Sequence, residues 1–84
     1  MNIVLKIREI TNALNMTIKD KKDIAEYLEH NELGLAFEVL CVAIERDKIK
    51  ISHNDYEIIN ELGNQMKIDN ELWINLENNI RKYQ

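Results

Sequence analysis

The chain has 84 residues, of which 45% are hydrophobic and 31% charged, and its formal net charge is −4. This length suits one domain, and the composition is that of a globular protein rather than a disordered one. With no proline and only two glycines, the chain lacks the turn residues that an all-β domain of this size would need. The excess of acidic residues opposes DNA or RNA binding, which normally needs a basic surface.

Cysteine content and hydropathy bear on where the protein works. Cys41 is the only cysteine, so no internal disulfide is expected. The N-terminal residues do not resemble a signal peptide, because Lys6, Arg8 and Glu9 interrupt any apolar stretch. No apolar run approaches the roughly 20 residues that a membrane-spanning helix needs. We therefore predict a single cytoplasmic domain over residues 1–84, without a linker and without membrane contact.

Two helices are predicted in the N-terminal part of the chain. Apolar residues recur at helical spacing, which predicts a first helix over about residues 2–15. Thr17 is predicted to cap a second helix, about residues 18–30, with Asp20 as the acidic partner in a capping box. The side chains expected to face the core are Ile3, Ile7, Ile10, Leu14, Ile24, Tyr27 and Leu28.

The third predicted helix, about residues 32–46, is the most apolar segment of the chain. Asn31 is expected to cap it, and Glu32 lies in its first turn, where the helix dipole favours an acidic side chain. Apolar residues cover most of its circumference, which is typical of a buried central helix. The one narrow stripe expected to reach water consists of Gly34, Glu38, Cys41 and Glu45.

Lysine and isoleucine alternate in residues 48–51. With no partner strand in the sequence, these residues are expected to form an extended connection whose isoleucines reach the core. Ser52 and Asp55 form a predicted capping box at the start of a helix over about residues 53–66. Gly63 destabilises a helix interior by roughly 1 kcal/mol relative to alanine, so close packing is expected there. The inward residues are Tyr56, Ile59, Leu62 and Met66.

Asp69 is predicted to cap a last helix over about residues 70–83. Tyr56 and Trp73 are candidate interface anchors, because aromatic residues often dominate binding energy, but their helical spacing favours core packing. Together the elements predict an all-α fold, a compact bundle of four to five short helices around a buried central helix at about residues 32–46. The apolar stripe of the last helix is Leu72, Leu76, Ile80 and Tyr83.

Side chains that could carry catalysis are few. Cys41 lies in the most apolar segment, which favours a core residue over a nucleophile. His30 and His53 are expected to be exposed near helix ends, and the pair of Glu26 and His30 supplies only two metal ligands. The two glycines lie too far apart for a phosphate-binding loop. We therefore predict no enzymatic activity, no cofactor and no metal.

Acidic and basic residues are separated along the chain. Residues 23–45 contain six acidic side chains and no lysine or arginine, and residues 51–66 contain three more. If the second, third and fourth helices pack together, their outer faces form an acidic surface that would steer a basic partner. The alternative is that this face is only solvated. The predicted contact residues are Asp23, Glu26, Glu29, Glu38, Glu45, Asp55, Glu57 and Glu61.

Two stretches of the sequence resemble the MafI family of immunity proteins. Residues 29–41, with Gly-Leu-Ala at 34–36 and Glu-Val-Leu at 38–40, resemble the central helix of that family. Ile51-Ser52, Leu62-Gly63 and residues 66–69 resemble its later half, so that the similarity extends over about residues 24–76. The resemblance implies a bacterial protein that binds and neutralises a polymorphic toxin, as in contact-dependent growth inhibition. It implies no particular contact residues, because such proteins diverge on the surface that faces the toxin.

The expected partner is the C-terminal domain of a cognate toxin, a basic nuclease domain, because a nuclease carries positive charge where it holds phosphates. Two other classes stay open. One is a helical adaptor or self-associating module without enzymatic activity. The other is a small nucleic-acid-binding regulator, whose best basic clusters would be residues 19–22 and 46–50.

Overall fold

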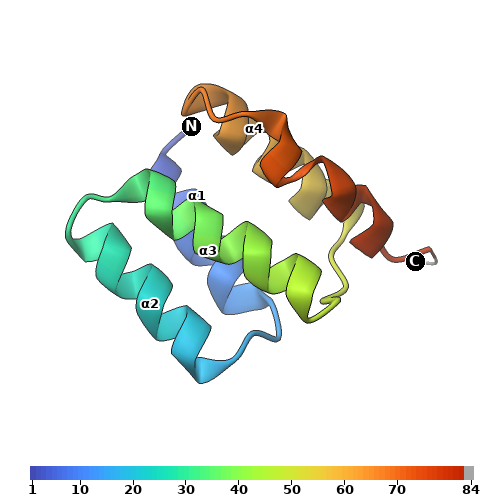
Figure 1. Ribbon diagram of the computed structural model, residues 1–84, viewed down its shortest axis with the longest axis horizontal. Helices are drawn as coiled ribbons and strands as arrows, with labels where there is room; N and C mark the ends of the chain where they lie inside the picture. Colours follow the sequence, from blue (N-terminus) through green and yellow to red (C-terminus); the bar gives the residue numbers. More distant parts are fainter. Residues whose placement is uncertain (83–84) are drawn as a thin grey trace.

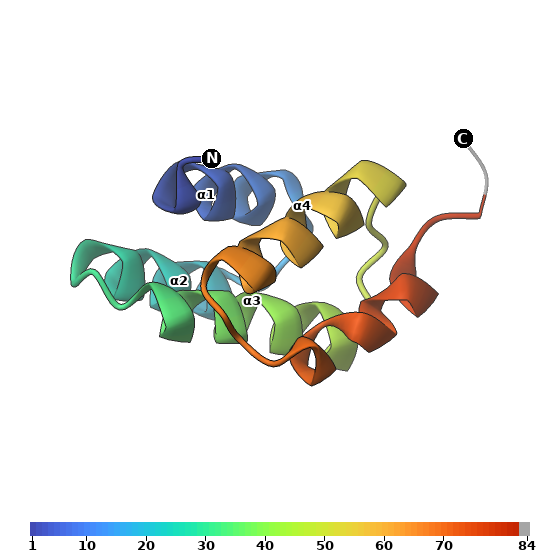
Figure 2. The ribbon, with the colours of Figure 1, turned by 90° about the horizontal axis from the view of Figure 1, so that it is seen from above.

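The computed structural model describes residues 1–82, and within them the chain forms four α-helices followed by two short 3-10 helices. The predicted all-α class is confirmed. Helices α2 and α3 and the two 3-10 helices lie in one layer, and α1 and α4 form a second layer (Figures 1 and 2). No described helix is long and apolar enough to cross a membrane. The elements are α1 (Ile3–Ala13), α2 (Ile18–Glu29), α3 (Leu33–Arg46), α4 (His53–Gln65), η1 (Asn70–Leu72) and η2 (Ile74–Asn79).

Helix α3 is the central element, because it packs against α1, α2, η1 and η2. Its residues Phe37, Leu40 and Ile44 are completely buried. The Phe37 ring meets the Trp73 ring edge to face, with 5.8 Å between centroids and 71° between the ring planes. Trp73 is also buried, and its indole N–H donates to Asn60 Oδ1 at 2.9 Å. Trp73 is therefore a core residue, as its spacing predicted.

The caps predicted at Thr17 and Ser52 are present, with one exchange of partners. Ser52 and Asp55 form the complete capping box at the start of α4. The Thr17 hydroxyl accepts from the backbone N–H of Asp20 at 3.1 Å and so caps α2. The predicted capping box would have the Asp20 carboxylate accept from the backbone N–H of Thr17. It accepts instead from the Arg46 guanidinium at the end of α3. It therefore ties the start of α2 to the end of its neighbouring helix.

The prediction that Asn31 caps α3 is wrong. Asn31 has a φ of 59° and follows the end of α2, while Glu32 occupies the N-cap position of α3 without a side-chain hydrogen bond. Asparagine tolerates this left-handed conformation better than most residues. Lys48 and Lys67 adopt the same conformation after α3 and α4, with φ of 52° and 58°.

Each of these three helix ends is a Schellman motif, in which two backbone N–H groups return to carbonyls of the last turn. After α3, the N–H of Lys48 donates to Glu45 O at 3.3 Å and that of Ile49 to Ile44 O at 3.0 Å. The equivalent bonds form at Asn31 and at Lys67. The same backbone motif therefore ends three of the four α-helices.

The segment after α4 departs from the predicted α-helix over residues 70–83. It consists of η1 and η2, and Ile80 is already extended, with φ of −70° and ψ of 133°. Ile80 forms a single parallel bridge with Ile51, in which Ile51 N–H donates to Asn79 O at 3.0 Å and Arg81 N–H donates to Ile51 O at 2.9 Å. The expected non-helical connection is present with both isoleucines buried, but its first residue, Lys48, is left-handed and not extended. The predicted inward position of Tyr83 lies outside the described residues.

Asn79 holds this segment against α3. Its buried side-chain amide donates to the backbone oxygens of Ile44 and Ile49, each at 3.0 Å. We expect Asn79→Ala to lower the free energy of unfolding by about 1–3 kcal/mol, because Ile49 O then loses a hydrogen bond inside the protein. Urea unfolding followed by circular dichroism measures this. Asn78→Ala is the matched control, since Asn78 is exposed, and an equal loss in both variants would contradict the role assigned to Asn79.

Candidate protein-binding surface

One face of α3 reaches solvent, although its apolar circumference predicted nearly complete burial. Leu35 and Val42 are 40% and 45% exposed, and Glu38 and Glu45 are exposed beside them. The prediction that Cys41 shares this stripe is wrong, because Cys41 is completely buried. The exposed face is thus rotated toward Leu35 and Val42, and η1 and η2 pack against α3. This exposed face has apolar residues next to free carboxylates.

A hollow lies between the first turns of α3 and the segment at residues 68–72. Its apolar residues, Ile68 and Leu72, are half-buried, and Gly34 leaves it open on the α3 side. Carboxylates from both elements surround it, and no lysine or arginine lines it. We call it the Gly34 hollow, and its lining residues are Gly34, Glu38, Ile68, Asp69, Glu71 and Leu72.

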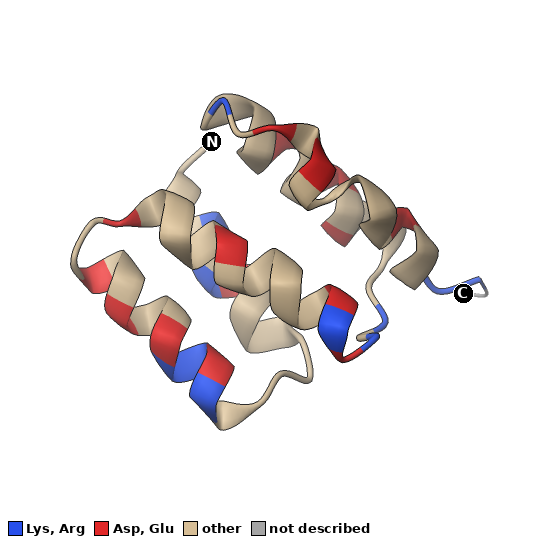
Figure 3. Cartoon of the chain, in the orientation of Figure 1, with Lys and Arg blue, Asp and Glu red and all other residues tan. Residues whose placement is uncertain are grey.

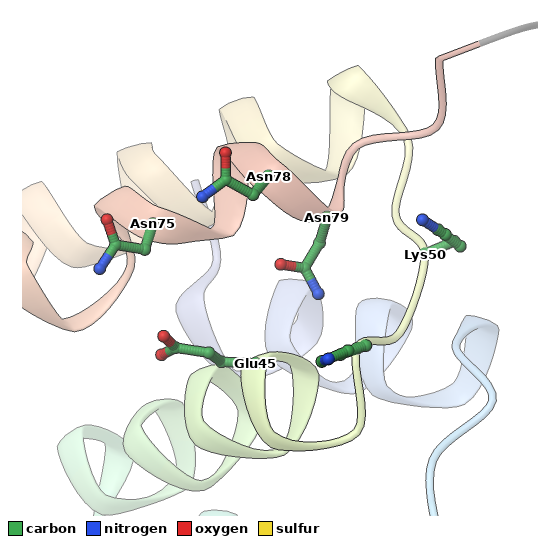
Figure 4. A pocket seen from close by; sticks show the side chains of 6 residues that line it. Glu45, Lys50, Asn75, Asn78 and Asn79 are labelled. Atoms are coloured by element: carbon green, nitrogen blue, oxygen red, sulfur yellow. The ribbon is translucent and has the colours of Figure 1, made fainter.

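A second hollow lies between the end of α3 and η2. Figure 4 shows Glu45 of α3 on one side and Asn75, Asn78 and Asn79 of η2 on the other, with Lys50 of the connection at its edge. This hollow is polar, and Lys48 and Lys50 line it together with Glu45. Amide, carboxylate and ammonium groups of this kind can form hydrogen bonds with a ligand.

The groove between α2 and α3 shares Glu38 with the Gly34 hollow, but its other charged side chains are paired. Lys19 Nζ lies 2.9 Å from an oxygen of Asp23, and Arg46 binds both Asp20 and Asp47. The hydrogen bond from Arg46 lowers the pKa of Asp47 below its ordinary value, and hydrogen bonds to Asp47 and Asp20 raise the pKa of Arg46. These cations are thus neutralised within the chain.

The eight acidic residues predicted as contacts are divided between the two layers; Figure 3 shows acidic positions on α2, α3 and α4, and Figure 2 shows the layers. Those of α2 and α3 lie in one layer, whereas those of α4 lie in the other, because α4 packs against α1 and the 3-10 helices. The premise that helices two to four share one outer face is therefore wrong. Glu26, Glu29, Glu38, Glu45 and Glu61 are exposed, Asp23 pairs with Lys19, Asp55 belongs to the capping box, and Glu57 lies 3.3 Å from His53.

Four residues of this surface were missed by the sequence reasoning. Asp69 was explained by its cap, which is present, since its side chain accepts from the N–H of Glu71 at 2.9 Å. Glu71 lies in the predicted helix over about residues 70–83, for which no contact surface was predicted. Leu35 and Val42 were attributed to the core on hydrophobicity alone. Their separation by seven residues places them on one face of α3, but only the positions of α2 and the 3-10 segment show that this face is open.

The described residues contain little that could support catalysis. Burial is the main reason that the pKa of the Cys41 thiol is raised far above its ordinary value, so the reactive thiolate is disfavoured. His30 and His53 are exposed, as expected. Residues 1–82 include no group of three or more His, Cys, Asp or Glu side chains that could hold a metal ion.

On the solvent face of α3, exposed aliphatic side chains lie beside carboxylates that have no ion pair within residues 1–82, and Cys41 is buried. Comparison with protein-family models, with curated proteins and with solved structures gave no significant match.

Proposed function

We propose that the protein is an immunity protein that binds and neutralises the toxin domain of a bacterial polymorphic toxin system. The observation that carries the proposal is the solvent face of α3, where Leu35 and Val42 lie among unpaired carboxylates. Protein interfaces commonly combine an apolar centre with a polar rim.

Charge gives the proposed partner its chemistry. The net charge of the chain is −4, and Glu38 and Glu45 project from the α3 face without a cation bound to them in the described structure. A nuclease toxin holds phosphates with positive charge, and a surface of opposite sign accelerates encounter and selects the partner. The similarity to MafI proteins supports the same class of partner. The proposal places the protein in the cytoplasm, where an incoming nuclease would act.

Co-purification tests the proposal directly. If a toxin-like C-terminal domain is encoded immediately upstream, it is expressed together with this gene, this chain is tagged, and the mixture is passed through gel filtration. A stable one-to-one complex together with rescue of cell growth supports immunity. Separate elution while the toxin still kills would rule it out.

Charge reversal locates the contact. We expect Glu38→Lys combined with Glu45→Lys to weaken toxin binding by about tenfold to a hundredfold, roughly 1.4–2.8 kcal/mol, and to reduce its salt dependence. Calorimetric titration at two salt concentrations measures both effects. Glu57→Lys combined with Glu61→Lys changes the charge equally on α4, in the other layer, and is expected to have a smaller effect. A larger loss in the α4 variant would assign the interface to that helix.

A self-associating helical module is the second candidate, and the same exposed Leu35 and Val42 favour it. Burying them against a second copy would remove apolar surface from water. Sedimentation over a range of concentrations separates the two functions. A dimer that Val42→Lys dissociates, in the absence of any toxin complex, would favour self-association.

The basic clusters at residues 19–22 and 46–50 could have favoured a nucleic-acid-binding regulator, but some of their cations form ion pairs with carboxylates of the same chain. Lys19 pairs with Asp23, and Arg46 pairs with Asp20 and Asp47. Phosphate binding would have to compete with these carboxylates. We therefore do not include nucleic acid in the proposed function.

A further inference from the structure

We infer that the Gly34 hollow receives an apolar side chain from a basic, amphipathic segment of the partner protein. The inference rests on the proposed function in taking the partner to be a basic protein. It goes further in naming the place of contact and the kind of segment. Three features of the hollow carry it: its open floor, its unpaired charge and its unsuitability for a metal ion.

The floor of the hollow is open because residue 34 is glycine. A Cβ atom built on Gly34 would have no atom within 4 Å, and the backbone of Gly34 does not have positive φ. Neither packing nor conformation therefore requires glycine here, in contrast to Gly63. Glycine also destabilises a helix relative to alanine. What glycine does provide is space between α3 and the half-buried Ile68 and Leu72, where an apolar side chain can be covered.

The rim of the hollow selects a cationic segment. Glu38 comes from α3, and Asp69 and Glu71 come from the segment opposite, so carboxylates stand on both sides. No described ion pair includes any of the three. The nearest lysine in sequence, Lys67, is not among the lining residues. The hollows beside Lys48 and Lys19 contain their own cations, so the Gly34 hollow has the stronger complementarity to lysine and arginine.

A lone cation or anion does not fit these observations. The described carboxylates do not group as metal ligands, and three negative side chains repel a free anion. An apolar floor with an acidic rim instead matches an amphipathic helix with an aliphatic residue at the centre and lysine or arginine three or four positions away. The occupant of the hollow is therefore such a helix of a protein partner.

A synthetic peptide tests the hollow independently of any toxin. The probe is an amphipathic 14-residue peptide with leucine on one face and lysine on the other, and its counterpart carries glutamate in place of lysine. Amide chemical shifts of the full ¹⁵N-labelled chain are followed during titration. We expect saturable changes at Gly34, Ile68 and Leu72 with the lysine peptide, and none with the glutamate peptide. Changes scattered over the whole surface, or confined to another face, would overturn the inference.

Two substitutions at Gly34 distinguish the effect of filling the hollow from an effect on folding. Gly34→Leu fills the floor and is expected to weaken binding of the lysine peptide at least tenfold, whereas Gly34→Ala is expected to change it less than twofold. Glu38→Gln combined with Glu71→Gln removes rim charge without adding bulk, and is expected to weaken binding and its salt dependence. Unchanged affinity in both the filled and the uncharged variants would overturn the inference.

The same variants distinguish this inference from the proposed function. If the toxin co-purifies equally with the original chain and with Gly34→Leu, the hollow is not its docking site, although the immunity function stands. If no toxin binds while the lysine peptide still maps to the Gly34 hollow, the hollow stands and the immunity function fails.

Discussion

Trp73→Ala is expected to lower the free energy of unfolding by about 3–5 kcal/mol, the range for truncating a buried tryptophan. Trp73 is 1% exposed and its ring packs edge to face on Phe37. The change removes this contact, leaves a cavity and also removes the donor to Asn60. A domain of this size has a total stability of roughly 4–13 kcal/mol, at about 0.05–0.15 kcal/mol per residue. The variant therefore loses a large part of the total stability, and it unfolds at room temperature if that total lies at the lower end of the range.

Urea unfolding followed by far-ultraviolet circular dichroism measures the effect, because the variant loses the only tryptophan fluorophore. Trp73→Phe is the control, since it keeps an aromatic ring against Phe37 but cannot donate to Asn60. It should retain part of the stability. A loss below about 1 kcal/mol in Trp73→Ala would show that the ring is not the anchor of the core.

Gly63→Ala is expected to destabilise the protein by about 1–3 kcal/mol, the usual cost of overpacking a core. This sign is opposite to that expected from helix propensity, which favours alanine by about 1 kcal/mol. The Cβ atom of alanine would overlap three atoms of the Trp73 ring. The ring cannot move aside easily, because Phe37 and Asn60 hold it from other directions.

Gly34→Ala makes the same chemical change in another helix where no atom lies within 4 Å of the added Cβ. It is expected to be neutral or to stabilise the protein by up to about 1 kcal/mol. Thermal and urea unfolding of the two variants side by side give the comparison. Stabilisation by both substitutions would show that Gly63 and Trp73 do not pack as closely as described.

The four α-helices could be predicted from the sequence because their signals are local. Helix α4 was predicted at about 53–66 and is observed at His53–Gln65, and the Ser52 cap depends only on residues three positions apart. The unfavourable helix propensity of Gly63 also predicted close packing at this position. The sequence did not predict that Trp73 is the residue packed against it. The all-α class rests on these local patterns.

The C-terminal segment could not be predicted in the same way, because distant contacts determine it. Its apolar spacing suits an α-helix, but Ile80 pairs with Ile51 and Asn79 binds carbonyls at the end of α3. The candidate surface was missed for a related reason. Acidic residues three or four positions apart share one face of a helix. The layer in which α4 lies, in contrast, depends on how all the helices pack together. The Gly34 hollow joins two segments that are 30 or more positions apart, and no local pattern connects them.

The three Schellman motifs have a consequence for the thermodynamics of association. The chain leaves α2, α3 and α4 through the same two backbone hydrogen bonds and one left-handed residue, at Asn31, Lys48 and Lys67. The α3 face is thus preorganised, and a partner that covers it need not order these connections at the expense of conformational entropy. The heat-capacity change of binding should then match the apolar area buried between rigid partners, without the larger negative value that accompanies coupled folding.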